Sequence, residues 1–409
     1  MPLFSITYTF PYLAFLIYLL ALMFIEFRYI TNDKDITHIR WATIVGYLFF
    51  FGLRGFILTD WTVYYPLFEK MPTIWDGGLV SAFNMEFTDE FTTDVSQGQT
   101  GMEMGFVYFT LLFKSIIPSY FAWMFFNVLI DILLLNTFIK RYSKYYVLAF
   151  VIFFVFEGLS IEINLVRNIK AILLFLVSIK YIVERRLVPF LLLNGLGLLF
   201  HTSALAFFPL YFFLHKTWSK KLIWSFFAGG VLILLLGVTY LAPILSFFGE
   251  MIGGRTSLLI ELYLKSDLYS GAFGLFHFGY LERVFTFCIM MTFYDKLKSQ
   301  NEHNVIFLNS YVIYFIIYFY FSEIRVIVER LPLLFVFANW ILYPNLFYLI
   351  KSRLNKVIFL CIFSLYSFVK ITNANQNILA RYDNLLFGIE NHEQRLETLI
   401  NNYDKIVDL

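Results

Sequence analysis

The stretch from Ser119 to Ile139 reads SYFAWMFFNVLIDILLLNTFI and is followed directly by Lys140 and Arg141. A helix that crosses a bilayer needs about 20 mainly apolar residues. Lysine and arginine at the end of such a run are typical of the cytoplasmic side. This stretch therefore predicts a membrane-spanning helix, and the rest of the chain repeats the pattern.

The composition of the whole chain indicates a membrane protein. Of its 409 residues, 60% are hydrophobic, 21% aromatic and 15% charged, whereas soluble domains carry about 25% charged residues. A soluble fold would expose large apolar patches. The net charge of +2 argues against a nucleic-acid partner, and Cys288 and Cys361 form no zinc, redox or disulfide pattern. A soluble enzyme, a disordered chain and a disulfide scaffold are excluded, and no metal or cofactor motif is visible.

The apolar runs between charges predict an all-α polytopic integral membrane protein with about 12 transmembrane helices, in a range of about 11–13. The predicted spans are 4–25, 41–58, 119–139, 146–160, 163–183, 187–200, 203–214, 222–245, 272–294, 305–321, 326–350 and 354–371. We expect one transmembrane domain over 1–371, followed by a polar C-terminal tail over 372–409 whose side of the membrane stays open.

The distribution of lysine and arginine predicts the orientation of the spans. The connection 59–104 has one lysine and many carboxylates, including Asp89, Glu90 and Asp94. It should therefore be extracytoplasmic, together with the N-terminus and an outer loop at 246–271. The basic connections, which should be cytoplasmic, contain Arg28, Lys34 and Arg40; Lys140, Arg141 and Lys144; Arg185 and Arg186; Lys216, Lys220 and Lys221; Lys296 and Lys298; Lys351, Arg353 and Lys356.

Two short apolar segments do not fit simple crossings. The run 106–117 precedes Pro118 and is too short to span, because 12 helical residues extend only about 18 Å. We interpret it as an interfacial or re-entrant helix at the outer face. The segment 187–214 has basic residues at both ends, so its two short arms should turn near His201, within the depth of the membrane.

Charged residues inside apolar runs are costly and point to function. Arg54 closes the second predicted span, and Arg167 and Lys170 share one face of the run 163–183. Asp131, with Asn127 four residues before it, is interpreted as a structural polar contact. Arg325 and Glu329 are spaced to pair with each other, which leaves Arg330 just before Pro332, where we expect a kink. Arginine suits bidentate phosphate binding, so the set favours a diphosphate site in the outer half of the membrane.

Several short motifs resemble those of the EpsG family, which contains Wzy-type polysaccharide polymerases. Phe51-Gly52-Leu53-Arg54-Gly55, followed by Thr59-Asp60 and Tyr64-Tyr65, is similar to that family's Phe-Arg-Gly…Gly-Thr-Asp…Tyr signature. Leu58 stands where the signature has glycine, and Leu53 is an extra residue. The other similar segments, in the family's order over roughly 40–345, are Glu103-Met104-Gly105-Phe106, with Met104 in place of proline, Arg167-Asn168-Ile169-Lys170-Ala171 and Phe200-His201-Thr202-Ser203-Ala204, with Arg330 as a late arginine.

The resemblance implies a GT-C-like glycosyltransferase in the bacterial cytoplasmic membrane. It would join oligosaccharide repeat units carried on undecaprenyl diphosphate at the outer leaflet, with a chain-length regulator and a flippase as expected partners. Arg167 and Arg330 would bind the diphosphate, with Lys170 and Arg54 in support. The candidate catalytic bases are His201 and Asp60, ranked above Glu103. No cofactor is expected.

Other functions stay open at this stage. A flippase or exporter of lipid-linked sugars would also need an arginine-lined cavity, but should carry cations near both leaflets. A membrane acyltransferase could use His201, yet would not explain several separate arginines. A structural scaffold is the least specific alternative.

Overall fold

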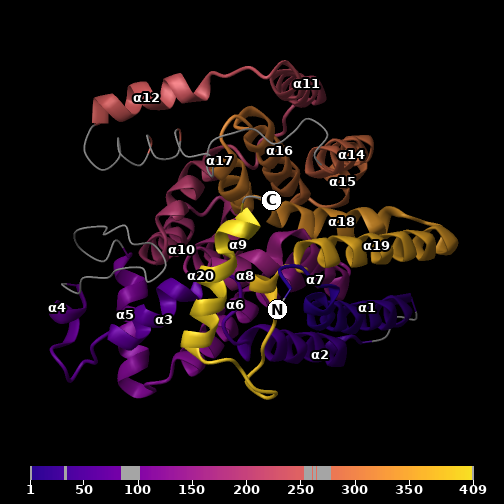
Figure 1. Ribbon diagram of the computed structural model, residues 1–409. Helices are drawn as coiled ribbons and strands as arrows, with labels where there is room; N and C mark the ends of the chain where they lie inside the picture. The colour runs from indigo at the N-terminus through magenta and orange to yellow at the C-terminus, as the bar shows by residue number, and fades with distance from the viewer. Residues whose placement is uncertain are drawn as a thin grey trace. The chain divides into compact units, whose positions relative to one another are not determined.

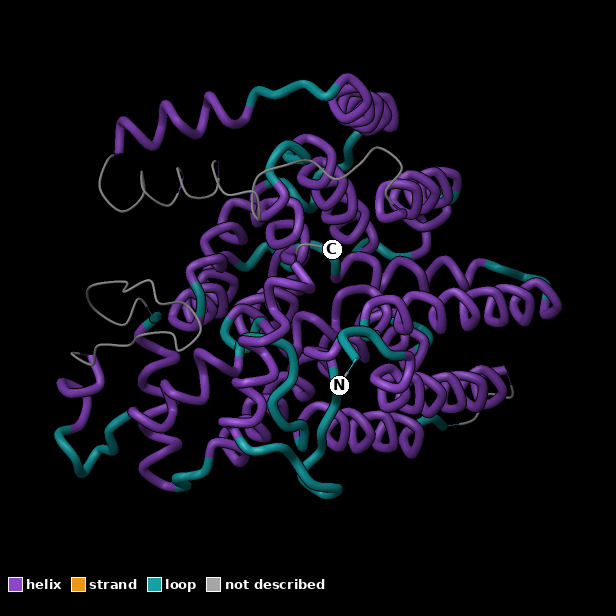
Figure 2. The backbone as a smooth tube through the Cα atoms, in the orientation of Figure 1, coloured by secondary structure: helices purple, strands orange, loops and turns teal. Residues whose placement is uncertain are grey.

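The computed structural model describes residues 2–31, 35–83, 102–252, 260, 264 and 278–407. Within these residues the chain is helical, with isolated β-bridges and no strand (Figures 1 and 2). The predicted all-α fold is thereby confirmed. The acidic group Asp89, Glu90 and Asp94 and most of the predicted outer loop 246–271 lie outside the described residues.

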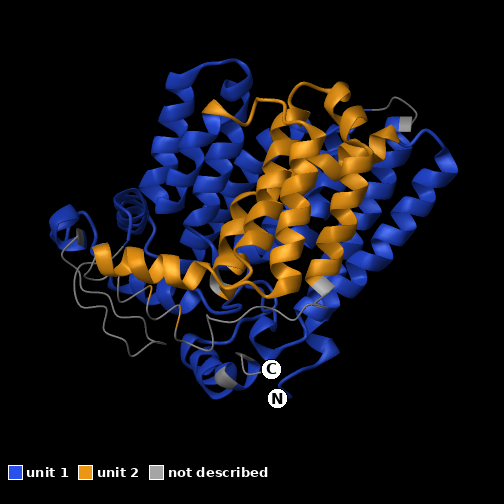
Figure 3. Ribbon diagram, turned by 90° about the horizontal axis from the view of Figure 1, so that it is seen from above, with its two compact units in different colours: residues 1–211, 350–409 blue, residues 212–349 orange. Residues whose placement is uncertain are grey.

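The helices form two compact units (Figure 3). Unit 1 comprises Met1–Tyr211 and Ile350–Leu409, so it contains the polar tail, and unit 2 comprises Phe212–Leu349. The helices of unit 1 are η1 (Ile6–Thr9), α1 (Phe10–Thr31), α2 (Thr37–Tyr47), the π-helical turn η2 (Leu48–Gly52), α3 (Trp61–Lys70), α4 (Gly78–Phe83), α5 (Met104–Ile116), α6 (Tyr120–Tyr142), α7 (Tyr146–Phe153), the π-helical turn η3 (Phe154–Gly158), α8 (Leu159–Asn164), α9 (Asn168–Val183), α10 (Leu187–Phe200), the 3₁₀-helix η4 (Thr202–Phe212), α19 (Arg353–Ala374), η6 (Ile378–Ala380) and α20 (His392–Val407). The helices of unit 2 are α11 (Lys220–Leu236), α12 (Leu241–Ile252), α14 (Phe278–Thr292), α15 (Tyr294–Gln300), α16 (Asn304–Tyr320), α17 (Arg325–Arg330), η5 (Leu331–Leu334) and α18 (Phe337–Leu349).

Four helical segments of the described chain are long and apolar enough to cross a membrane, or up to six if each bent pair is one span. The expected number of about 12 spans is not confirmed, because other apolar runs form helices of only 10–17 residues. Helix α6 covers the stretch that opened the sequence analysis. Ser119 caps its N-terminus by accepting a hydrogen bond from the Ala122 amide, and Lys140 and Arg141 lie in its last turn.

Two predicted spans are bent. The run 222–245 is not one helix, because α11 ends at Gly237, which has a φ of 59°, and α12 follows at 94°. A glycine in this left-handed conformation is a common helix terminator. The run 326–350 bends by 59° between η5 and α18, after Pro332, in agreement with the predicted kink.

The two short segments end where the sequence predicted a break. Helix α5 has 13 residues, fewer than a span needs. Helix α10 ends at Phe200, and His201 is extended, with a φ of −158°, before η4 begins. The chain therefore breaks its α-helical path at His201, where the sequence predicted a turn.

The polar tail is an integral part of unit 1. Its backbone pairs with the segment that carries the first motif: the Gly55 amide donates to Asp383 O, the Leu58 amide to Leu379 O, and the Leu385 amide to Leu53 O, at 2.8–2.9 Å. Two further backbone hydrogen bonds, from Ser5 to Gln376 and from Ile378 to Leu3, join the tail to the N-terminal residues.

Two arginines hold the tail together. Arg395 of α20 is 2% exposed and donates to Arg381 O, with Glu390 at 3.4 Å and Asp383 at 4.0 Å. Burial lowers the pKa of Arg395 to about 10, while the Asp383 carboxylate opposes that shift. The side chain therefore remains charged at neutral pH. Arg381 in turn forms an ion pair with Glu390.

Leu58 has a backbone conformation that favours glycine. Its φ is 59°, and this is the position at which the family signature carries glycine. For an L-residue with a side chain, the left-handed region costs about 1–2 kcal/mol. The conformation is held by the Leu58 amide, which bonds Leu379 O, and by Leu58 O, which accepts from the Trp61 indole.

We expect Leu58→Gly to raise the free energy of unfolding by about 1 kcal/mol, because it relieves this strain. The measurement is thermal unfolding of the purified protein in detergent. Leu53→Gly is the matched control, since Leu53 has a φ of −105° and gains nothing from glycine. Equal destabilisation by both substitutions would show that Leu58 carries no strain.

Candidate functional site

An ion pair between Glu103 and Arg167 is the centre of the candidate site in unit 1. Arg167 Nη1 lies 2.6 Å from Glu103 Oε2, and the side chains are 22% and 12% exposed, respectively. The other carboxylate oxygen of Glu103, Oε1, accepts a hydrogen bond of 2.9 Å from the Thr202 amide. One carboxylate therefore joins three segments that are far apart in the sequence.

Local structure explains how the two side chains meet. Glu103 is the N-cap residue of α5, where the helix dipole favours a negative charge. Arg167 lies between α8 and α9, and its guanidinium is 5.9 Å from the centre of the Phe106 ring, one turn into α5. Arg167 Nε also donates a long hydrogen bond of 3.4 Å to the Tyr64 hydroxyl.

Tyr64 of α3 is buried beside this arginine. Burial raises the pKa of Tyr64 to about 12, and the charge of Arg167 opposes the shift. The phenol is therefore neutral at physiological pH and accepts from Arg167 as a hydroxyl. Within the described part of the chain, Arg167 Nη2 donates to no protein group, so this edge of the guanidinium remains available to a ligand.

His201 belongs to a hydrogen-bonded turn next to the ion pair. Its Nδ1 lies 2.8 Å from Ser203 Oγ, and Ser203 Oγ donates to Asn168 Oδ1 at 2.5 Å. The Ser203 amide donates a hydrogen bond of 3.1 Å to Nδ1. Because Nδ1 accepts this bond, the neutral imidazole carries its proton on Nε2. A general base at Nε2 requires the other tautomer, in which the amide bond is released and Nδ1 donates to Ser203 Oγ. Thr202, in the same turn, bonds Glu103.

Arg54 is buried and bonded to backbone oxygens. It is 4% exposed, and its terminal nitrogens donate to Phe51 O at 2.7 Å and to Glu162 O at 3.2 Å. Arg54, Tyr64 and Val166 line one small cavity. Arg54 thus lies near the segment that leads into Arg167 and contributes positive charge there.

Lys170 has a different environment from the one expected of a diphosphate ligand. Its Nζ lies 2.8 Å from Asp131 Oδ2 and 3.1 Å from Val166 O, and both charged side chains are 2% exposed. A buried cation needs such a partner. The sequence predicted a polar contact between Asp131 and Asn127. In the structure Asp131 pairs with Lys170 instead. The Asn127 amide donates to Trp123 O.

The remaining candidates are Asp60 and Arg330. Asp60 caps α3, and its carbonyl accepts from the Val63 and Tyr64 amides, so it lies one turn from Tyr64. Arg330 ends α17 in unit 2 and is exposed. The predicted neighbour pair Arg325 and Glu329 does form, with 2.8 Å between Nε and Oε1.

Several polar residues of this region were not predicted as site residues from the sequence. Tyr64, Asn168 and Ser203 belong to the quoted motifs, and their polarity was the signal that could have selected them. Glu162 is 2% exposed and its Oε2 accepts a hydrogen bond of 2.6 Å from Tyr47. Hydropathy offers no reason to select Glu162, because this residue lies between two predicted spans, where a loop is expected.

Two glycines, one of them in a quoted motif, lie where helices approach closely. A Cβ on Gly105 would lie 2.7 Å from Leu199 O of α10, and a Cβ on Gly197 would lie 3.3 Å from Ala171 Cα of α9. Helix α10 therefore packs directly on α5 and α9, which carry Glu103 and Arg167 at their N-terminal ends. These contacts bring the His201 turn to the ion pair.

A model of the EpsG family matches residues 38–384 of the chain. The match includes the first motif and, of the tail residues paired with it, Leu379 and Asp383, and so extends beyond the expected range of 40–345. No curated protein and no solved structure matches the chain.

We expect Gly105→Ala to lower the free energy of unfolding by about 1–3 kcal/mol, because the new methyl group overlaps Leu199 O. Gly195→Ala is the matched control on α10. A Cβ there meets nothing within 4 Å, so alanine should stabilise the helix by about 1 kcal/mol. Thermal unfolding in detergent measures both, and a stabilised Gly105→Ala variant would contradict the close contact.

Proposed function

Because the chain belongs to the EpsG family, we propose that this membrane-embedded protein is a glycosyltransferase that polymerises oligosaccharide repeat units. The units are carried on undecaprenyl diphosphate and joined at the outer leaflet of the bacterial cytoplasmic membrane. The proposal includes a GT-C-like architecture of about 12 spans. A chain-length regulator and a flippase are its proposed partners.

The observation that carries this proposal is the junction at Glu103. Three of the family-like segments meet there: Glu103 itself, Arg167, and Thr202 of the His201 turn. A partly exposed arginine with one uncommitted edge is a suitable ligand for a phosphate group. His201 lies in the same turn, and its Nδ1 contacts both the Ser203 hydroxyl and the Ser203 amide.

The reaction would proceed by substitution at the anomeric carbon of the donor. An acceptor sugar hydroxyl attacks this carbon, the bond from the carbon to the diphosphate oxygen breaks, and the hydroxyl proton passes to a base. Negative charge develops on the departing diphosphate, and fixed cations aimed at it lower the barrier. We assign this role to Arg167, while Arg330 of unit 2 stays a candidate from the family resemblance.

The surroundings divide the other candidates by role. Glu103 has both oxygens bonded, so we assign it to orienting Arg167 and the 201–203 turn. Arg54 and Lys170 are bonded to backbone oxygens and to Asp131, so we assign them to shaping the local potential without direct contact. His201 is the preferred base, and Asp60 is the alternative.

We expect Arg167→Ala to lower polymer formation by about 100- to 1,000-fold, because a charge stabiliser of the transition state is lost. Arg167→Lys should not restore full activity, since lysine cannot bind bidentately. The measurement is the length distribution of the glycan in cells that carry the variant as their only copy.

Arg186→Ala is the matched control, because this side chain is 63% exposed and lies in a predicted cytoplasmic connection. It should leave the glycan ladder unchanged. Single-repeat glycans in the Arg167→Ala strain support a polymerase. Absence of exported glycan would indicate a flippase, full-length unmodified polymer an acyltransferase, and loss of the protein from the membrane a structural role.

The assignment of the base gives a second prediction. His201→Ala should lower kcat by about 100- to 10,000-fold with little change in KM for the acceptor. Ser203→Ala should cause a smaller loss, because it removes only the partner of Nδ1. Polymerisation is measured with purified enzyme and lipid-linked repeat units. Full activity of His201→Ala would transfer the role to Asp60.

A further inference from the structure

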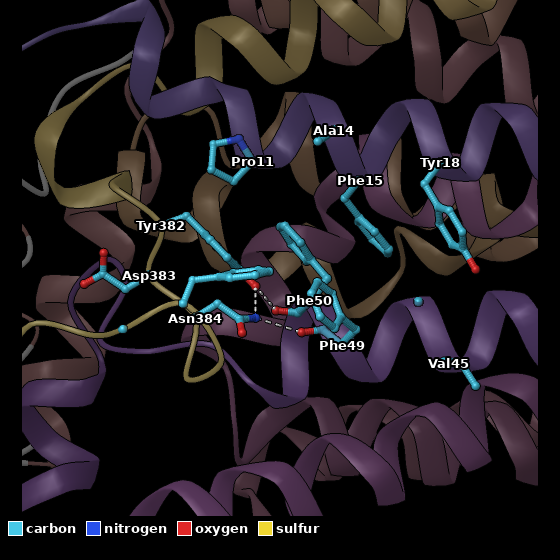
Figure 4. A pocket seen from close by; sticks show the side chains of 13 residues that line it. Pro11, Ala14, Phe15, Tyr18, Val45, Phe49, Phe50, Tyr382, Asp383 and Asn384 are labelled. Carbon is cyan, nitrogen blue, oxygen red and sulfur yellow. Dashed lines mark hydrogen bonds between the residues drawn. The ribbon is translucent and has the colours of Figure 1, made fainter.

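An apolar groove of about 600 Å³ lies in unit 1 between α1, the end of α2 with η2, and the C-terminal tail (Figure 4). Its volume is typical of a ligand site. The floor is aromatic: Phe15 and Phe50 stack with 4.4 Å between ring centres, and Phe50 stacks on Tyr382 at 4.8 Å. Val45 and Phe387 lie at its edge and are 61% and 80% exposed.

The polar groups at one end of the groove are already bonded within the protein. The Tyr382 hydroxyl donates to Phe50 O at 2.7 Å, and the Asn384 amide donates to Phe49 O at 3.1 Å (Figure 4). Asn384 Oδ1 accepts from the Leu386 amide. Asp383 points away from the rings in Figure 4, and its carboxylate accepts from the Glu390 amide. The groove thus offers mainly hydrocarbon contacts, and the carboxylate of Asp383 lies 4.0 Å from the Arg395 guanidinium.

The size of the groove favours one hydrocarbon chain. With about 30 Å³ for each methylene-sized group, the volume share of a water molecule, 600 Å³ holds about 20 carbon groups. A phospholipid would bring two hydrocarbon chains, whose combined volume exceeds that of the groove. A single isoprenoid chain of about four units fits this volume.

The polar end of the groove is continuous with the segment that holds Arg54. Phe50 lines the groove, and Arg54 follows four residues later with its guanidinium bonded to Phe51 O. Asn384 lines the groove as well and forms a backbone bridge with Arg54. The polar end of the groove therefore lies next to the backbone of Arg54, whose buried guanidinium contributes positive charge nearby.

We propose that this groove binds the diphosphate-proximal isoprenoid units of the lipid carrier and so guides the diphosphate toward Arg54 and Arg167. This inference rests on the proposed function, because it takes the lipid diphosphate as the substrate. It assigns the C-terminal tail a role in substrate binding, since Tyr382, Asn384 and Phe387 form one wall of the groove.

The test uses the full-length protein in nanodiscs of phosphatidylethanolamine and phosphatidylglycerol. The probe is a polyisoprenyl diphosphate with a photoreactive diazirine on an isoprene unit near the diphosphate, and labelled peptides are mapped by mass spectrometry. Labels should map to Phe15, Phe49 or Phe387. Unlabelled polyisoprenyl diphosphate should compete, and added phosphatidylglycerol should not.

Substitutions with larger side chains that project into the groove test whether the probe binds there. Ala14→Phe on α1 should cut labelling by about tenfold or more, because it displaces one or two buried hydrocarbon groups. Val45→Trp does the same from the opposite wall if Ala14→Phe lowers expression. Ala21→Phe is the matched control on α1, exposed and outside the groove, and should leave labelling unchanged.

The outcomes separate the groove from the proposed function. Labels elsewhere in a protein that still makes polymer would overturn the proposed groove site and leave the proposed polymerase function standing. Competition by phosphatidylglycerol would identify it as a site for bulk lipid and overturn the proposal. Labelled groove residues in a protein that elongates no glycan would support the proposed lipid site and overturn the proposed polymerase function.

Discussion

The ion pair between Glu103 and Arg167 is the constraint on which the rest of the site depends. A charge with little solvent exposure must be compensated by a partner, and here one carboxylate compensates an arginine 64 residues away in the chain. The same carboxylate bonds the Thr202 amide, so the pair also positions the His201 turn. Close packing around Gly105 and Gly197 is then required, because wider helix spacing would break these short contacts.

The charged residues in apolar segments divide into two physical classes. Lys170 pairs with Asp131, both 2% exposed, and this bond leaves little for a ligand. Arg167 is 22% exposed and keeps one edge of its guanidinium uncommitted within the described residues. The sequence predicts that each charged residue in an apolar run has a structural or functional role, because desolvation of a charge is costly. It cannot distinguish these classes, because a partner such as Asp131 lies on another helix.

Local properties of the fold could be predicted from the sequence, and long-range pairings could not. The apolar runs, the break at His201 and the bend after Pro332 follow from hydropathy and backbone chemistry over a few residues. The 94° bend at Gly237 was missed, because glycine is also tolerated inside membrane helices. The number of about 12 spans is not confirmed, because several apolar runs of the described chain form helices of only 10–17 residues, and hydropathy measures polarity and not the point at which a helix stops. The pairing of the tail with the first motif leaves no periodic signal at either place.

The tail pairing also constrains the path of the chain across the membrane. The bonds of Ser5 with Gln376 and of Leu3 with Ile378 place both ends of the helical region at the same face of unit 1. A chain that leaves one face of a bilayer and returns to it crosses an even number of times. If the N-terminus is extracytoplasmic, as the lysine and arginine distribution predicts, the tail, Arg54 and the polar end of the groove lie on that side as well.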